Sequence, residues 1–426
     1  MTETPCGAPL ARHHSGLRWQ EWLVGQALPL WAQAGFDRAT SLFHERLTFS
    51  AAPQAVPALR LMVQARQIAT YCRAAAEGLY GDGEKALRCL ATIERLYHRR
   101  DDEAGWIFSL SPTLEALDTK RDLYAHAFII YAYHWAFRLS GDVVYYRKAR
   151  ETLRDVRQIF ADAGDGLRGA FPGKDDVRGQ DPIMHLLEAC LVWMPHAEHP
   201  DFQEQADKLA RLALTRLIDN ATGMIREYFD ASWRPLQVEG KNHIEPGHVF
   251  EWSWLLRLYA RLTRDAAARR PVEDASTRLF EAGQRFGLQD GGVIDAIRET
   301  GAPMSRNMRI WPQTEFYRLL TVLRHDTAPE AADRMKIEAA MQNVTNLFFT
   351  RFTTGAPEGG GLTAFVKTGQ AALITCPRVH FTIFMVPRRR VESTTHLDDG
   401  GFISPAQENG RAHHERRRIG TSRDTF

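Results

Sequence analysis

A histidine and a glutamate, three residues apart, begin an aromatic-rich part of the chain. The segment EPGHVFEWSWLL (residues 245–256) carries His248 and Glu251 just after Pro246. Proline favours the first turn of a helix, and three-residue spacing puts both side chains on one helical face. Histidine titrates near neutral pH and a carboxylate raises its basicity, so the pair suits general acid–base catalysis. A helix-capping histidine beside a surface ion pair is the alternative.

Other polar or aromatic side chains interrupt apolar helical segments in the same way. Each also has a structural explanation, such as a core histidine, a core tryptophan or a first-turn acid. Together they predict one polar, aromatic-lined cavity for a sugar, because tryptophan faces stack on sugar rings while carboxylates and arginines bind hydroxyls. The residues are Arg66 in MVQARQ, Tyr124 in RDLYAHAF, Asp181 and His185 in QDPIMHLLEA, and Trp311 and Glu315 in RIWPQTEF.

No metal or cofactor is predicted for this cavity. The zinc fingerprint His-Glu-x-x-His is absent, and His-x-x-Glu alone is a weak signal. Residues 164–169, GDGLRG, match a dinucleotide-binding pattern, but they follow a helical stretch and do not lead into a helix, so we interpret them as a loop.

Helical periodicity predicts the elements that must position these residues. Apolar side chains recur at three- and four-residue steps along most of the chain, and glycine- and proline-rich loops separate the segments. We therefore expect a single all-α domain of paired helices. Eleven helices are predicted, near residues 19–34, 58–79, 82–98, 121–138, 144–163, 181–195, 201–217, 247–262, 272–287, 306–324 and 331–351.

Composition narrows the class of protein. The formal net charge is +2, which indicates neither a nucleic-acid nor a membrane-surface partner. No apolar run approaches the roughly 18 residues of a membrane span, and the first residues lack the pattern of a signal peptide. The five cysteines are scattered, which is typical of reduced thiols. We expect a cytoplasmic protein, with its state as monomer or homo-oligomer left open.

Five segments in this order give the chain a specific resemblance to a known family. RLMVQARQ, DLYAHAF, QDPIMHLLEA, EPGHVFEWSWLL and RIWPQTE resemble segments of the N-acylglucosamine 2-epimerase superfamily, especially its mannose-isomerase branch. The likeness covers residues 17–358 and implies an (α/α)6-barrel catalytic domain. Such proteins interconvert aldoses and ketoses, or epimerise sugars at C2, without a metal or redox cofactor.

The resemblance also implies roles for individual residues. His248 would be a catalytic acid/base supported by Glu251, and Arg66 would bind near the carbonyl or enediolate oxygen. His185 would assist ring opening or substrate binding, and Trp311 would form part of the pocket wall. Asp181 stands where similar proteins usually have asparagine, which implies altered contacts to sugar hydroxyls.

The C-terminal residues 359–426 depart from the family. Its ending, which carries a second catalytic histidine on the last helix, is absent, and an arginine-rich sequence of disordered type stands there instead. Read from each third base, however, the codons of Gly360–Gly369 permit the family's WIDRFxxNG, and Leu373–Val386 permit its DYVPASTLYHI. We interpret this tail as out of frame, so that the last barrel helix is missing or disrupted.

The sequence therefore predicts a sugar isomerase of mannose/fructose type that moves a proton through a cis-enediolate. A 2-epimerase acting on N-acylglucosamine or on a disaccharide such as cellobiose is the alternative within the family. A helical-barrel glycoside hydrolase would need two carboxylates that flank the bond, for which only Glu251 and Glu315 are candidates. An inactive sugar-binding relative is a third class, because the C-terminus is altered.

Overall fold

A computed structural model describes residues 14–354, except 163, 164, 174, 175, 197 and 238–241, together with residues 364–365 and 371–372. All described residues belong to one compact unit of the chain. The predicted tail, residues 359–426, falls outside the described residues apart from those two pairs, and so does the prediction that the last helix is missing or disrupted.

Helices occupy all eleven predicted positions. The first is one continuous rod, because the backbone stays helical from α1 through a π-helical turn (Leu23–Ala27) into α2. The helices are α1 (His14–Trp22), α2 (Leu28–Gln33), α3 (Leu61–Ala76), α4 (Gly83–Tyr97), α5 (Leu123–Ser140), α6 (Val143–Ile159), α7 (Gln180–Trp193), α8 (Asp201–Leu212), α9 (Pro246–Leu262), α10 (Ala266–Gly287), α11 (Ile310–Asp326) and α12 (Ala332–Leu347). A 3-10 turn (Met194–His196) follows α7, and π-helical turns follow α8 (Ala213–Leu217) and α12 (Phe348–Phe352).

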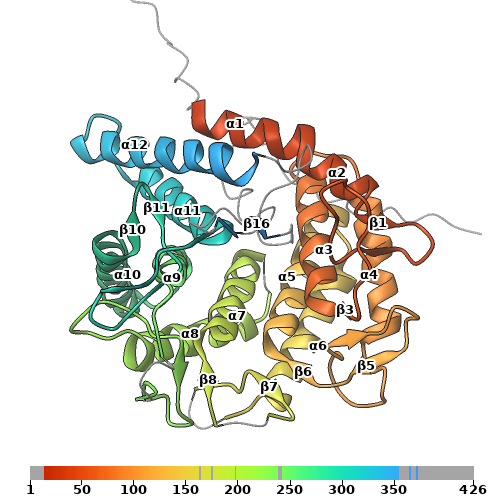
Figure 1. Ribbon diagram of the computed structural model, residues 1–426. Helices are drawn as coiled ribbons and strands as arrows, with labels where there is room; N and C mark the ends of the chain where they lie inside the picture. Colours follow the sequence, from red (N-terminus) through yellow and green to blue (C-terminus); the bar gives the residue numbers. More distant parts are fainter. Residues whose placement is uncertain are drawn as a thin grey trace, which may run out of the picture. The chain divides into compact units, whose positions relative to one another are not determined.

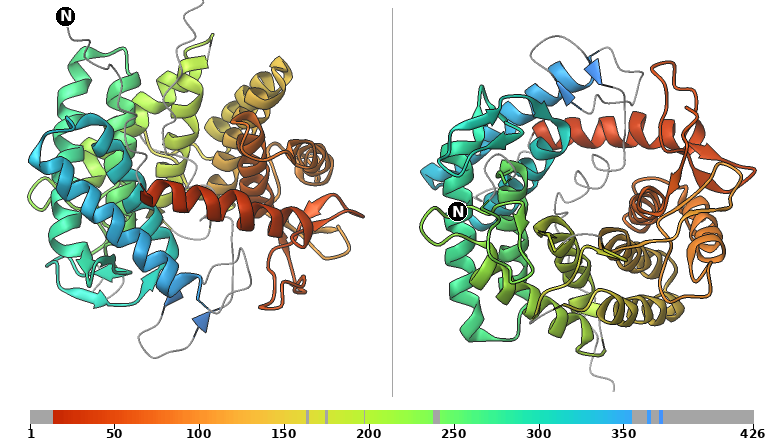
Figure 2. Two further views of the ribbon diagram at one scale, coloured as in Figure 1. Left: turned by 90° about the horizontal axis from the view of Figure 1, so that it is seen from above. Right: turned by 60° about the horizontal axis from the view of Figure 1, so that its bottom comes forward.

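Inner and outer helices alternate along the chain, as expected for an (α/α)6 barrel (Figures 1 and 2). The inner helices α3, α5, α7, α9 and α11 contact one another in that order, and each packs on the outer helix that follows it. Inner helices such as α5 and α9 are buried over most of their length, whereas outer helices such as α6 and α8 bury one face. The described residues thus supply five inner helices and six outer rods.

Aromatic packing joins the two ends of this helical series. The Trp19 ring of α1 lies 4.0 Å from the Phe348 ring beyond α12, and its Nε1 donates a 3.0 Å hydrogen bond to Thr345 Oγ1 of α12. Both side chains of this hydrogen bond are buried. The first outer rod is therefore fixed against the last one.

Short strands make up the loops at one end of the barrel. Each inner helix starts directly after an extended residue, namely Arg60, Asp122, Gly179, Glu245 or Arg309. The strands are β1 (Phe36–Asp37), β2 (Leu42–Phe43), β3 (Leu59–Arg60), β4 (Ser109–Leu110), β5 (Ala116–Asp118), β6 (Arg121–Asp122), β7 (Ala170–Phe171), β8 (Arg178–Gly179), β9 (Tyr228–Phe229), β10 (Leu288–Gln289), β11 (Gly292–Val293), β12 (Ala296–Ile297), β13 (Pro303–Ser305), β14 (Met308–Arg309), β15 (Ala364–Phe365) and β16 (Ala371–Ala372).

These strands pair only in antiparallel twos and threes, including β3 with β4 and β8 with β9. They anchor the N-terminal ends of the inner helices, where most of the predicted site residues lie. Among the described helices, none has both the length and the apolar character that crossing a membrane requires.

Candidate active site

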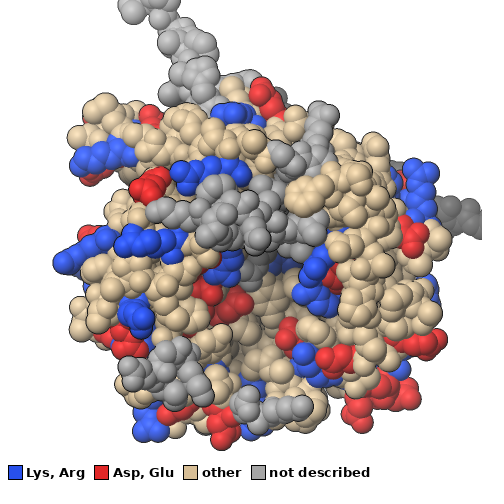
Figure 3. Space-filling model, viewed as in Figure 1, with Lys and Arg blue, Asp and Glu red and all other residues tan. Residues whose placement is uncertain are grey.

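The first turns of the inner helices surround a cavity of about 580 Å³. Figure 3 shows a hollow on this side of the molecule, with acidic and basic side chains around its edge. Of the predicted site residues, Arg66, Tyr124, Asp181 and Trp311 line this cavity, as does Arg309. Four inner helices therefore contribute side chains to one cavity, and the role of these side chains in binding a sugar stays a prediction.

His248 lies behind this cavity wall with a carboxylate on its inner nitrogen. Its Nδ1 is 3.0 Å from both Oε1 and Oε2 of Glu227. Glu227 directly precedes β9, the strand that pairs with β8. Burial disfavours the charged imidazole, but Glu227, Asp181 and Glu245 together raise the pKa of His248 to about 9. Because Glu227 engages Nδ1, the Nε2 atom is the one left for chemistry. The carboxylate expected beside His248 is thus Glu227, not Glu251.

Asp181 links His248 to the second histidine of the site. Its Oδ1 lies 3.2 Å from Nε2 of His185 and 3.5 Å from Nε2 of His248. The Asp181 side chain is 29% exposed, whereas each imidazole is only 6% exposed. A single carboxylate oxygen therefore faces both imidazoles, and Asp181 stands between them and the cavity.

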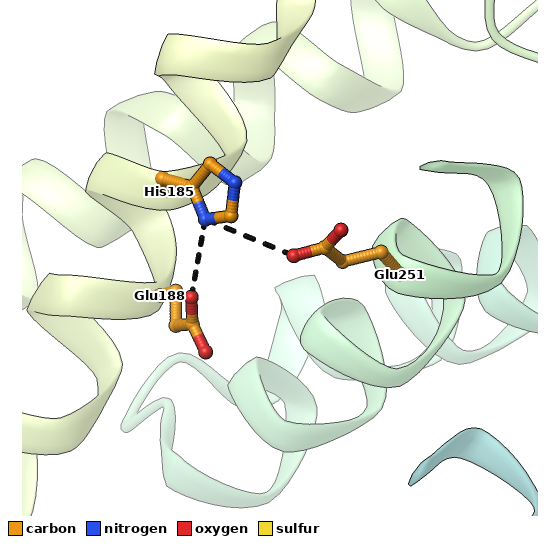
Figure 4. A group of neighbouring side chains, drawn as sticks. All are labelled: His185, Glu188 and Glu251. Atoms are coloured by element: carbon orange, nitrogen blue, oxygen red, sulfur yellow. Dashed lines mark hydrogen bonds and ion pairs between the residues drawn. The ribbon is translucent and has the colours of Figure 1, made fainter. Parts of the chain in front are cut away.

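His185 is the centre of a buried cluster of charged groups (Figure 4). Its Nδ1 is 3.2 Å from Glu188 Oε2 and 3.7 Å from Glu251 Oε1. Burial opposes protonation of this imidazole, but its neighbours Tyr124, Glu251, Asp181 and Glu188 outweigh that effect, so the pKa of His185 stands well above its ordinary value. Glu251 therefore supports His185 directly.

The same cluster continues through Glu315 on α11. Burial and the neighbouring charge of Glu315 raise the pKa of Glu251 to about 8. Glu315 itself accepts a 3.1 Å hydrogen bond from Trp254 Nε1 and lies at the inner end of the site, not among the cavity-lining residues. The predicted role of Glu315 in substrate binding stays a prediction, and the contact that the structure shows is with the Glu251 cluster.

Arg318 supplies the positive charge of this cluster. Its Nη1 lies 3.0 Å from Glu188 Oε1 and 3.8 Å from Glu315 Oε2, and the guanidinium stacks 3.5 Å from the Trp254 ring centroid. The Arg318 side chain is only 1% exposed, so its charge has lost most of its hydration. The acids around it offset this loss, which would strongly destabilise an unpaired arginine. Arg318 fixes Glu188, which in turn fixes His185.

His185, Glu188 and Glu251 also have the donor types of a metal site. Their ligand atoms all lie within 4.8 Å of one another (Figure 4). Glu188, however, already has one oxygen on Arg318 and the other on His185, and Arg318 provides the compensating charge. The contacts of these three residues thus fit an ion-pair cluster better than a metal centre, and the prediction of a metal-free site stays in place.

Arg66 and Tyr124 form a donor group on the opposite side of His185. Arg66 Nη1 donates a 2.6 Å hydrogen bond to Tyr124 Oη, and its guanidinium stacks 4.4 Å from the Phe128 ring centroid. The Tyr124 ring meets the His185 ring edge-on at 4.7 Å. A guanidinium held in this way can stabilise negative charge that develops on a substrate oxygen.

Trp311 covers His248 at the cavity wall. The two ring centroids are 4.6 Å apart at an interplanar angle of 35°. The neighbouring Arg309 donates to Glu245 Oε2 at 2.6 Å and to Asp295 Oδ1 at 2.9 Å, which joins the head of α11 to the head of α9. Trp311 thus offers the cavity an aromatic face that suits a sugar.

Several residues of this candidate site were missed in the sequence. Glu227 lies in a loop, 21 residues before His248, so no local spacing connects the two. Glu188 and Arg318 did carry a signal, because each lies three residues after a predicted site residue, His185 and Glu315 respectively. Charged residues at these inner-face positions require partners.

The sequence profile of N-acylglucosamine 2-epimerases (GlcNAc 2-epimerases) matches residues 43–356. The chain belongs to this family. Curated N-acylglucosamine 2-epimerase relatives include the mannose-6-phosphate isomerase of Rhizobium meliloti (strain 1021), which is 33% identical over 328 residues, covering 75% of this chain and 82% of the relative. A cellobiose 2-epimerase of Bacteroides fragilis is 24% identical over 316 residues, covering 70% of this chain and 78% of the relative.

The solved structures agree with the family's fold. A crystal structure of D-mannose isomerase superposes with a TM-score of 0.75 at 14% identity, covering 88% of this chain and 99% of that one. This member of the N-acylglucosamine 2-epimerase family is therefore an (α/α)6 barrel, and it is an enzyme of the isomerase/epimerase type.

Proposed function

We propose that the protein interconverts mannose and fructose by proton transfer through a cis-enediolate. The observation that carries this proposal is His248, whose Nδ1 is bound by Glu227 and whose Nε2 points to the cavity wall at Asp181. Removing a proton next to a carbonyl needs such a base together with a cationic group near the developing oxyanion. Arg66, on the cavity wall, meets the second requirement.

In this mechanism the opened sugar lies against Trp311, with its carbonyl oxygen toward Arg66. Neutral His248 takes the C2 proton, and the electron pair moves toward O1. The resulting imidazolium exchanges its Nε2 proton with solvent and donates a proton to C1, which forms the ketose. His185, whose neighbouring carboxyl groups raise its pKa well above the ordinary value, donates a proton to a sugar oxygen during ring opening.

Isomerisation is favoured over 2-epimerisation by the number of proton carriers it needs. An isomerase moves one proton between C2 and C1 on one face of the enediolate, so a single base on carbon suffices. A 2-epimerase needs a carrier on each face, and among the described residues one imidazole, His248, is left for carbon, because His185 serves the sugar oxygens in this mechanism. The names of the Rhizobium meliloti and Thermobifida fusca relatives, mannose-6-phosphate isomerase and D-mannose isomerase, support the same choice.

Product analysis tests this proposal. The purified full chain is incubated with mannose, and the sugars are separated and identified by NMR. We expect fructose to accumulate, and we expect His248→Asn to abolish it while the exposed control His325→Asn leaves it unchanged. Accumulation of glucose from mannose, or of a 2-epimer from cellobiose alone, would make the protein an epimerase.

We propose further that residues 17–358 form the catalytic domain, that residues 359–426 are out of frame, and that the enzyme works in the cytoplasm. The family match to residues 43–356 supports the catalytic domain, and the buried free thiols Cys72, Cys89 and Cys190 support the cytoplasm. Resequencing the coding DNA across Gly359 tests the frameshift, because a single-base correction should restore the family's C-terminal segments.

A further inference from the structure

Asp181 lies at the centre of the site but has no step in the proposed mechanism. Its Oδ1 faces Nε2 of His185 at 3.2 Å and Nε2 of His248 at 3.5 Å, and its partly exposed side chain lines the cavity. A sugar in this cavity meets Asp181 before it meets either imidazole. The carboxylate is thus placed to pass a proton between the substrate and His185.

Isomerisation of an aldose requires two proton movements, not one. Besides the proton that goes from C2 to C1, the hydroxyl proton of O2 must leave and O1 must gain one. His248 has only Nε2 free for this work, because its Nδ1 is held by Glu227, and that nitrogen is occupied with the carbon-bound proton. A second group must therefore serve the oxygens.

We propose that Asp181, together with His185, is the proton relay between O2 and O1 of the enediol. This role rests on the proposed isomerase function. In the first half, His248 removes the C2 proton, the C1=C2 bond forms, and the negative charge on O1 lies beside Arg66. In the second half, Asp181 accepts the O2 proton as the C2=O2 bond forms, O1 takes a proton from the His185 imidazolium, Asp181 passes its proton to His185, and C1 takes a proton from His248. All three side chains return to their starting state.

The surroundings of His185 fit a relay. On its Nδ1 side the ring faces Glu188 and Glu251, so a proton taken up at Nε2 is stabilised by two carboxyl groups. Tyr124 contacts the ring edge, and Asp122 adds its charge near Asp181 from the head of α5. His248 faces Glu227 and Glu245 on the other side of Asp181, so the two imidazoles act as separate carriers.

The variant Asp181→Asn tests the relay because it keeps the size of the side chain but cannot take up a proton. The full-length protein is incubated with mannose in deuterated water, and NMR follows two rates, namely deuterium entry at C2 of the remaining mannose and formation of fructose. The first rate needs only proton removal and return by His248, whereas the second also needs the O2-to-O1 transfer. We expect fructose formation to fall by about 100-fold or more, in the range for a general acid–base group. Exchange at C2 should fall much less.

Two further variants serve as controls for this test. Asp181→Glu, which retains a carboxyl group, should recover part of the fructose rate, and Asp274→Asn on the exposed surface of α10 should change neither rate. An equal fall of both rates in Asp181→Asn, or no fall, would overturn the relay while leaving the isomerase intact. Absence of both exchange and fructose in the unmodified protein would instead overturn the proposed function itself.

Discussion

Replacing Glu227 with glutamine should change the acid–base behaviour of His248 in a calculable direction. Glu227 is the largest of the charges that raise the pKa of His248 from 6.5 to about 9, against the opposing effect of burial. Both carboxylate oxygens lie 3.0 Å from Nδ1, so glutamine keeps one acceptor there and removes only the charge. The change therefore isolates electrostatics from geometry.

The expected magnitude follows from the strength of the bond. A hydrogen bond to a charged group contributes about 1.5–3 kcal/mol, against about 0.5–1.5 kcal/mol for a neutral one. The difference of roughly 1–1.5 kcal/mol corresponds to about one pKa unit, since one unit equals about 1.4 kcal/mol. His248 must be neutral to accept the C2 proton, so activity rises as pH rises through its pKa. In Glu227→Gln this acidic limb should move about one unit toward lower pH.

The assay is the pH dependence of kcat/KM for mannose, which reports the groups that titrate in the free enzyme. The control is Glu84→Gln, because the Glu84 side chain is 91% exposed and far from any site residue in sequence. A limb that stays in place in Glu227→Gln would show that Glu227 does not set the protonation of His248, and the assignment of the base would then be wrong.

Three other perturbations have defined outcomes. Trp311→Ala should raise KM for mannose about twofold to tenfold, because stacking on an aromatic face contributes about 0.5–1.5 kcal/mol, and Trp311→Phe should raise it less. Equal kinetics in the unmodified protein and both variants would contradict the place of Trp311 in the pocket wall. Dialysis against a chelator should leave kcat/KM unchanged, because Arg318 supplies the positive charge beside Glu188; a loss that added divalent cation restores would make the His185 cluster a metal site. The free energy of unfolding should decline as pH falls from about 6.5 toward 4. Burial lowers the pKa of His126 to about 4, so the unfolded chain protonates this histidine at a higher pH than the folded chain does. Urea unfolding at several pH values should show a flatter decline in His126→Gln.

The sequence predicted the helical scaffold well because its signal is long and repeated. Each of the eleven helices has several turns of apolar periodicity, and proline or glycine separates most of them, so the pattern leaves little ambiguity. Residues at the heads of the inner helices were placed correctly for the same reason. His248 and Trp311, for example, both lie in the first turn after an extended residue.

Partners brought together by tertiary packing could not be predicted. His248 and Glu251 share a helical face by spacing, yet in the structure Glu227 contacts His248 and Glu251 lies beside His185. These pairings depend on how α7, α9 and the loop before β9 meet, which no local pattern encodes. Asp181 was noted as a departure from the family, but its contact with both imidazoles appears only in the folded chain.

The central claim is that His248 moves the proton on C2. The most direct test follows mannose in deuterated water by NMR with the full-length protein and with His248→Asn. The account predicts fructose with one deuterium at C1 and mannose with deuterium at C2 for the unmodified protein, and neither product for the variant. Undiminished deuterium entry at C2 in His248→Asn would contradict it, because another group would then be the base.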